Sequence, residues 1–170
     1  GLHPSFAGGD YWAMTNPRAL PRVFVPRRVE PAPEARARLA LLSSPDFDPR
    51  EVAYVEEPIA LPPNGRGQVR ITSELPTRIT VSANMETPGL LVLADLFDAG
   101  WQAFLAGRPT PILRVNHAVR GVILPAGESV VEFRYWPAGF TTGFRLAGLG
   151  LAILLGWSAC LLWRRRQVTR

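Results

Sequence analysis

The chain has 170 residues, of which 47% are apolar and 19% are charged, and its formal net charge is +5. This length suits one domain, and this composition argues against an intrinsically disordered chain. Arg164, Arg165, Arg166 and Arg170 account for most of the excess positive charge, and the other 15 arginines are balanced by 14 acidic residues. A nucleic-acid-binding protein is therefore not expected.

The N-terminal segment, residues 1–21, is rich in Pro, Gly and aromatic residues and shows no sustained period, so we expect a lead-in loop. Gly1–Asp10 lacks the charged and apolar regions of a signal peptide, which suggests that the chain is part of a longer protein. Cys160 is the single cysteine, so a disulfide framework or a cysteine-based zinc site within the chain is excluded.

A β-rich domain is predicted over residues 22–140. In its first half, one short amphipathic helix is expected over Glu34–Ser43, with Pro33 near its first turn and Leu39 and Leu42 on one face. The other segments are short and either apolar or alternating, which is typical of strands: Arg22–Pro26, Val52–Val55, Gln68–Thr72 and Arg78–Ala83. The last two alternate, and we expect them to be half-exposed strands of a second sheet or a sheet extension.

The second half of this domain predicts five more strands in fewer than fifty residues: Leu90–Ala94, Trp101–Leu105, Pro111–Val115, Val119–Leu124 and Val130–Tyr135. Breakers separate them at Asp98–Gly100 and Ala106–Pro109, and Pro125–Glu128 has the composition of a hairpin turn. The predicted fold is mainly β, an antiparallel β-sandwich-like domain with one short helix.

A membrane-spanning helix is predicted over residues 143–163, because Leu146–Trp163 is an 18-residue stretch without charge. A buried core helix is the alternative, but little chain remains to cover it. Arg145 and Trp163 mark the two boundaries, and the basic tail of residues 164–170 favours a cytoplasmic C-terminus, which places the β domain outside the cytoplasm. Small residues recur every four positions in this helix and favour packing against other transmembrane helices: Gly148, Ala152, Gly156 and Cys160.

Catalytic signatures are absent from the sequence: it contains no G-x-S-x-G, H-E-x-x-H, P-loop or dinucleotide-binding glycine motif. Asp46 and Asp48 could suggest a metal site, but a calcium site needs more oxygen ligands, and a turn is the preferred interpretation. We expect no cofactor and no metal.

Possible contacts to a glycan or another ligand are Asp95, Trp101, Asn116 and Arg120. Each has a structural alternative. Asp95 and Asp98 could form a turn, His117 beside Asn116 could simply be solvated, and core packing is the favoured role of Trp101.

Several short motifs occur in a fixed order: Asn16–Phe24, Phe47–Pro49, Leu91–Asp95, Gly100-Trp101-x-Ala103, Arg114-x-Asn116, Arg120–Val122, Pro125–Gly127 and Phe133-x-Tyr135-x-Pro137. In this order and spacing, the chain resembles the C-terminal part of YfhO-type bacterial multi-pass membrane proteins. It departs from that pattern at Ala106, where an Asp-Gly turn is usual, and at Ser129, where a His is common.

The resemblance implies a glycosyltransferase-like (GT-C type) protein of the bacterial cytoplasmic membrane that uses polyprenyl-phosphate-linked sugars. Its catalytic acids would belong to an early extracytoplasmic loop outside this chain, so no catalytic residue is assigned here. The partners implied are the lipid bilayer, other transmembrane helices of the parent protein and an envelope glycan or lipid-linked sugar. The alternative is a tail-anchored β module that binds envelope glycan or protein without enzyme activity.

Overall fold

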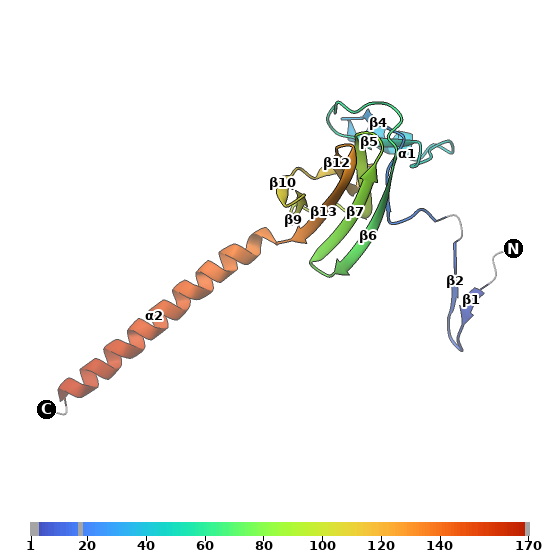
Figure 1. The fold of residues 1–170 in the computed structure, drawn as a ribbon. Helices are drawn as coiled ribbons and strands as arrows, with labels where there is room; N and C mark the ends of the chain where they lie inside the picture. The colour runs from blue at the N-terminus through green and yellow to red at the C-terminus, as the bar shows by residue number, and fades with distance from the viewer. Residues whose placement is uncertain (1–3, 17–18, 169–170) are drawn as a thin grey trace.

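The structure, a computed structural model, describes residues 4–16 and 19–168. Two sheets pack face to face, and one long helix leaves them (Figure 1). The five-stranded sheet has the order β10-β9-β13-β7-β6, with β6 Gly67–Leu75, β7 Arg78–Met85, β9 Trp101–Leu105, β10 Arg108–Thr110 and β13 Gly127–Tyr135. The six-stranded sheet has the order β3-β8-β12-β11-β5-β4, with β3 Val23–Phe24, β4 Arg28–Pro31, β5 Val52–Val55, β8 Gly89–Leu96, β11 Leu113–Val115 and β12 Val119–Leu124. The mainly β, sandwich-like prediction is confirmed.

The main core lies between the two sheets. Leu91 and Leu93 of β8 meet Phe133 of β13 and Val81 of β7 there, and all four side chains are buried. Because successive residues of a strand point to opposite faces, Leu90 and Val92 of β8 enter a second cluster on the outer face of the six-stranded sheet. The partly buried members of that cluster include Ile59 and Leu61, from the loop after β5. Burial on both faces explains why β8 is a continuous apolar run.

The short helix α1 spans Ala35–Leu42, as the sequence predicted. Glu34 caps its N-terminus by accepting hydrogen bonds from the backbone N–H groups of Arg36 and Ala37, and Ser43 caps the C-terminus. The expected apolar face is confirmed only for Leu42, which is half-buried and packs against the cluster of Ala32, Val52 and Tyr54. Arg38 is the buried residue of the helix and Leu39 is exposed. The Arg38 guanidinium donates to the Ala32 carbonyl oxygen and to Glu56 (2.9 Å), which offsets the cost of burying a charge.

Four segments differ from the sequence prediction. Arg108 and Pro109, expected in a breaker, belong to β10, which pairs antiparallel with β9. Pro125–Glu128 does not close a hairpin, because β12 and β13 belong to different sheets. β4 is an additional strand and pairs parallel to β5, with α1 as the crossover between them. Within the expected lead-in loop, β1 Pro4–Ala7 and β2 Trp12–Met14 form a two-stranded antiparallel hairpin. Figure 1 shows this hairpin apart from the sandwich.

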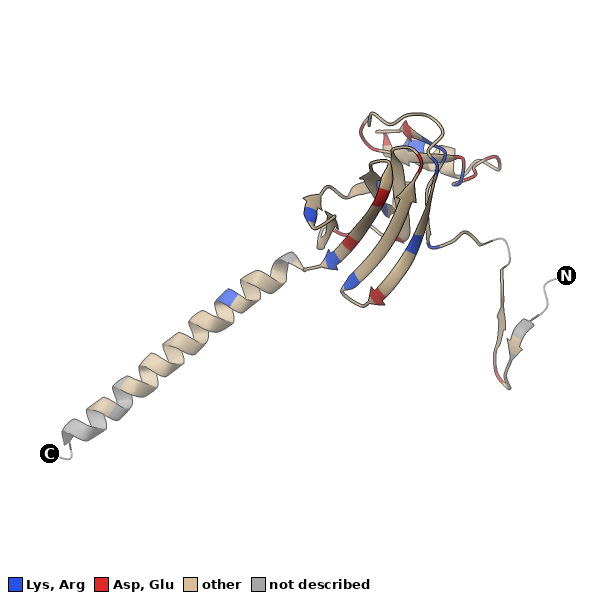
Figure 2. Ribbon diagram, in the orientation of Figure 1, with Lys and Arg blue, Asp and Glu red and all other residues tan. Residues whose placement is uncertain are grey.

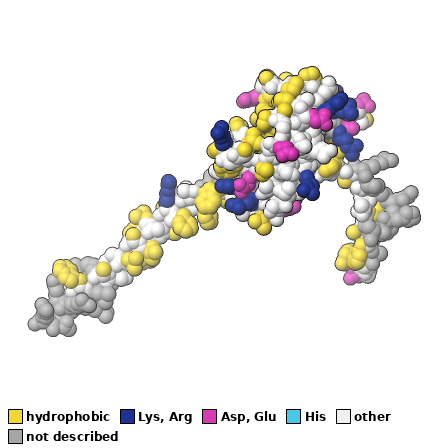
Figure 3. All heavy atoms as spheres, viewed as in Figure 1, with side chains coloured by type: hydrophobic (Ala, Val, Ile, Leu, Met, Phe, Trp, Pro, Cys, Tyr) yellow, Lys and Arg dark blue, Asp and Glu magenta, His cyan; other side chains and the backbone are white. Residues whose placement is uncertain are grey.

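The long helix α2 spans Ala138–Val168 and begins three residues after β13 ends. It is the one helix of the described chain that is long and apolar enough to cross a membrane. The span covers Gly139–Ala159, slightly earlier than the predicted residues 143–163, and none of it is buried in the molecule. Apolar side chains recur along the coloured part of this helix, separated by backbone atoms and small or polar side chains (Figure 3). A helix of this kind is suited to contact with a lipid bilayer.

Candidate functional site

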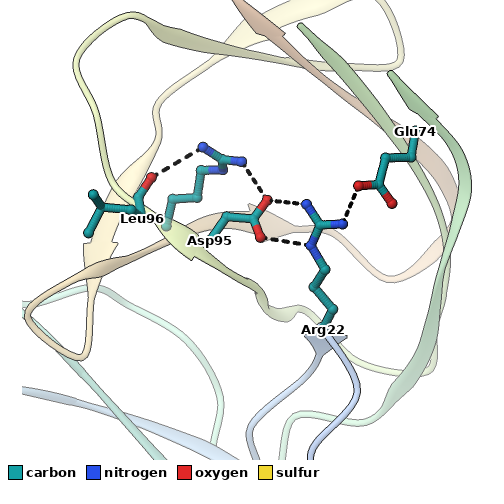
Figure 4. Close-up of polar contacts among 5 residues, drawn as sticks. Arg22, Glu74, Asp95 and Leu96 are labelled. Atoms are coloured by element: carbon teal, nitrogen blue, oxygen red, sulfur yellow. Dashed lines mark hydrogen bonds and ion pairs between the residues drawn. The ribbon is translucent and has the colours of Figure 1, made fainter. Parts of the chain in front are cut away.

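Charged side chains from distant parts of the chain meet at the end of the sandwich from which α2 leaves. Arg22 precedes β3, Glu74 lies near the end of β6, Asp95 lies near the end of β8 and Arg120 lies on β12. We call these four residues the arginine–carboxylate cluster (Figure 4). Over the rest of the sandwich, basic and acidic residues are interspersed (Figure 2), consistent with the near neutrality of this part of the sequence.

Asp95 is the centre of this cluster. Its two carboxylate oxygens accept hydrogen bonds from Arg22 Nε (2.7 Å) and Arg22 Nη2 (2.8 Å), a bidentate pair. Arg120 Nη2 donates to Asp95 Oδ2 at 2.8 Å. The other side of the Arg22 guanidinium donates to Glu74 at 2.5 Å. The cluster therefore joins the edge of the five-stranded sheet to two strands of the six-stranded sheet.

Arg120 is the most deeply buried member of this cluster, with 2% of its surface exposed. Its guanidinium carbon lies 3.9 Å from the centroid of the Trp101 ring and 5.6 Å from that of Phe133. Trp101 also packs against Tyr135, with the ring centroids 5.1 Å apart. Trp101 is thus held between an arginine and a tyrosine, and the cation–π contact stabilises the buried charge.

The electrostatics of the cluster favour its charged state. Hydrogen bonds from Arg22, and then the charges of Arg22 and Arg120, lower the pKa of Asp95 against the opposing effect of burial. The bonds to Asp95 and Glu74 raise the pKa of Arg22. Burial lowers the pKa of Arg120, and Asp95 opposes that change. Asp95 is consequently a weak base near neutral pH and a strong anchor for two guanidinium groups.

A cavity of about 450 Å³ opens beside this cluster. Its lining combines three charged side chains with apolar ones: Arg22, Glu74, Leu75, Pro76, Ile79, Asp95 and Trp101. Guanidinium and carboxylate groups next to an aromatic ring can hydrogen-bond and pack against a polar ring such as a sugar. The cavity is therefore suited to binding a small polar group.

The structure brings together three of the four residues predicted as ligand contacts, namely Asp95, Trp101 and Arg120. Asn116 lies elsewhere, in the turn between β11 and β12, where its side-chain oxygen accepts a hydrogen bond from the Tyr54 backbone N–H (2.8 Å). Its own backbone N–H donates to the Tyr54 carbonyl oxygen (2.8 Å), which fixes β11 to β5. His117 follows with a φ of 70° and is half-buried.

The turn alternative is wrong for Asp95, which lies in β8 and pairs with two arginines. The Asp98 side chain accepts a hydrogen bond from the Gly100 backbone N–H (2.7 Å), which confirms that Asp98 forms a turn. Asp48 likewise accepts one from the Arg50 backbone N–H (2.9 Å). Among the described residues, no group of three or more His, Cys, Asp or Glu side chains could hold a metal ion.

The small residues of α2 lie on an exposed helix. A Cβ atom added at Gly148 or Gly156 would meet nothing within 4 Å, and Ala152 is exposed. The Cys160 side chain lies outside the described part of the structure. The packing of this stripe against other helices therefore stays a prediction.

Sequence reasoning missed Arg22 and Glu74 as members of the cluster and also missed a large open groove of about 1450 Å³. This groove runs beside β3, β6 and the start of β13, and its polar lining includes Gln68, Arg70, Asn84 and Glu128. Alternation along β6 and β7 could have suggested the outward-facing polar side chains. No sequence signal places β3 next to them.

Comparison of the chain with protein-family models, curated proteins and solved structures finds no match.

Proposed function

We propose that the chain is a non-catalytic extracytoplasmic domain and the last membrane helix of a YfhO-like membrane protein, a polyprenyl-phosphate-sugar-dependent glycosyltransferase acting on cell-envelope glycans. The observation that carries the non-catalytic role is the pairing of the acids at the cavity. Asp95 is bound by two arginines and Glu74 by one. General acid–base catalysis is most efficient when the pKa of the carboxyl group lies near the working pH, and the pKa of Asp95 is lowered.

The position of the cavity supports a role with a membrane-bound substrate. The cavity lining includes Leu75 and Pro76 of the β6–β7 turn, and Thr77 of the same turn accepts a hydrogen bond from the Tyr135 backbone N–H (2.8 Å), three residues before α2. A lipid-linked sugar presents its polar headgroup at the bilayer surface. The domain is thus suited to support the acceptor or the headgroup while the chemistry occurs in another part of the parent protein.

The domain lies outside the cytoplasm in this proposal. Trp163 and Arg164–Arg166 follow the span at its C-terminal end, and clusters of arginine next to a span favour the cytoplasmic side. The sandwich, at the other end of α2, then faces the envelope glycans.

A tail-anchored β module that binds envelope glycan or protein is the second candidate. The large groove beside β3 and β6 favours it, because its amide and charged side chains offer both donors and acceptors to a hydroxyl-rich ligand. Many apolar spans encoded upstream of Gly1 would favour the glycosyltransferase, whereas a signal peptide directly upstream would favour the binding module.

The direct test reconstitutes the purified chain in liposomes with a polyprenyl-phosphate sugar and a glycan acceptor. We expect no turnover above that of empty liposomes. The parent protein should be active when its preceding spans are present, and deletion of residues 1–135 from it should weaken acceptor use or folding. Turnover by the isolated chain that is lost in Asp95→Asn would show that the cluster is catalytic and would overturn the proposal.

A further inference from the structure

Three large apolar side chains are exposed at the end of the sandwich from which α2 leaves. They are Leu75 in the β6–β7 hairpin (55% exposed), Leu96 at the end of β8 (73%) and Trp136 between β13 and α2 (52%). We call these residues the apolar rim. Exposed apolar residues are common singly, but a group at one end of a domain marks a contact surface.

Backbone hydrogen bonds fix the apolar rim to the start of α2. The Tyr135 N–H donates to the Thr77 carbonyl oxygen (2.8 Å), which ties the β6–β7 turn to the end of β13. The Trp136 N–H donates to the Gly100 carbonyl oxygen (2.7 Å), which ties the loop after Leu96 to the same place. The β6–β7 turn and the loop that follows Leu96 are therefore both tied to the residues that lead into the helix.

The junction between the sandwich and the helix is also held by side chains. Trp136 Nε1 donates to Thr141 Oγ1 (2.9 Å), and the Trp136 and Phe140 ring centroids lie 5.1 Å apart. Phe140 in turn lies 5.8 Å from Phe144. An apolar surface thus continues from Trp136 along α2 without a flexible linker, and Figure 3 shows apolar side chains on both sides of the junction.

The chemistry of the rim matches the interfacial layer of a bilayer. Aromatic residues are enriched at that depth, and arginine side chains can extend from it toward lipid phosphates. Arg78 and Arg134 are both about half exposed at this end of the sheet and share Glu132 as their acidic partner, so one of their positive charges is uncompensated.

We propose that the apolar rim rests on the bilayer, with Leu75, Leu96 and Trp136 in the interfacial layer. The membrane-spanning helix and the rim then form two connected contacts with one membrane, which holds the sandwich in one orientation. This inference requires α2 to span the bilayer but does not require the glycosyltransferase assignment.

The test uses the full chain in phosphatidylcholine–phosphatidylglycerol liposomes, in a Cys160→Ala background. Single cysteines at Leu75→Cys and Leu96→Cys carry an environment-sensitive fluorophore. Ile123→Cys in β12 and Val130→Cys in β13 are matched controls at exposed apolar positions away from the rim. Leu155→Cys in α2 reports insertion of the helix. The two quenchers are a lipid with a shallow spin label and aqueous iodide. Each variant must keep the melting temperature of the Cys160→Ala chain.

We expect the lipid-borne quencher to reduce the signal at positions 75 and 96 at least twofold more than at positions 123 and 130. Iodide should show the reverse order. Equal behaviour of rim and control positions would overturn the proposal, and so would protection of the rim from both quenchers, which would indicate a protein partner. Absence of lipid quenching at Leu155→Cys would overturn the inference together with the membrane span. The glycosyltransferase proposal is tested separately by the turnover assay.

Discussion

Arg120 illustrates how single residues hold the candidate site. Its guanidinium is buried, and one of its neutralising partners is the carboxylate of Asp95, which also binds Arg22. Removing one partner of a buried ion pair leaves an uncompensated charge, which typically costs about 3 kcal/mol or more. The cluster is therefore a structural clamp whose strength depends on the protonation of Asp95.

The stability of the sandwich should consequently fall in acid because of Asp95. Its pKa is lower in the folded state than the ordinary value near 4 in the unfolded state, so its contribution is complete above about pH 5. That contribution is lost as the pH falls through 4 and then through the folded-state pKa. Melting curves between pH 7 and 2.5 should show that Asp95→Asn is less stable than the unsubstituted chain at neutral pH. The two melting temperatures should converge in acid. A constant difference at all pH values would contradict this, and Asp46→Asn, remote from the cluster, is the control.

Trp101 should matter more for stability than for binding. The side chain is half-buried between Arg120 and Tyr135, and removal of a large aromatic residue from a core costs about 3 to 5 kcal/mol. We expect Trp101→Ala to lose about 3 kcal/mol in chemical denaturation, whereas Trp12→Ala, in the exposed hairpin, changes little. A Trp101→Ala variant that keeps its melting temperature but loses glycan binding would reverse this interpretation.

At the scale of elements, turns and close contacts between strands determine which residues a position can accept without loss of stability. Ala106 and Gly107 join β9 to β10 with φ values of 48° and 79°, and alanine is strained in this left-handed region. We expect Ala106→Gly to raise the free energy of unfolding by about 1 kcal/mol. The matched change Ala126→Gly, at a turn residue without a positive φ, should lower it slightly. Destabilisation by Ala106→Gly in denaturant titrations would show that the turn is not strained.

Gly121 shows the opposite requirement, for space. A Cβ atom at this position of β12 would lie 2.8 Å from the Leu91 carbonyl oxygen and 2.8 Å from Val115 Cγ2. Gly121→Ala should therefore destabilise the sandwich by about 3 kcal/mol, because backbone must shift. Gly9→Ala, in open space, is the control. Equal melting temperatures for the two variants would contradict the close approach of β8 and β12.

The strands themselves could largely be predicted from the sequence, but their partners could not. Trp101–Leu105 and Val119–Leu124 match β9 and β12 residue for residue, because period-2 alternation and breakers act locally. Pro125 and Ala126 do connect β12 to β13, whereas Gly127 and Glu128 already belong to β13, and turn composition cannot show that the chain crosses to the other sheet there. β4 was missed because its arginine and proline content hides an edge strand.

The candidate site was predictable only in part for a related reason. Asp95, Trp101 and Arg120 were recognisable as side chains able to contact a ligand, and the structure does bring them together. Arg22 is 73 residues from Asp95 in the sequence, and local sequence patterns cannot predict that two such distant residues pair. Asn116 has the right chemistry but is used by the turn that fixes β11 to β5.

At the scale of the whole molecule, the proposed function depends on the side of the membrane that the sandwich faces. The positive-inside tendency predicts that the sandwich faces away from the cytoplasm. A cysteine at Arg108→Cys, on exposed β10, in a Cys160→Ala background should react with a membrane-impermeant maleimide in intact cells. Labelling that occurs only after the cells are opened would place the sandwich in the cytoplasm.

The position of β13 has a mechanical consequence. This strand leads directly into α2, yet it is the central strand of its sheet, with eight residue pairs to β7 and five to β9. Tension applied through α2 would load β13 along its length, so both ladders of hydrogen bonds would have to shear together before the strand could leave. Because forced unfolding is governed by the unfolding rate, this arrangement should make the sandwich resist pulling from the membrane side much longer than pulling from its N-terminal hairpin.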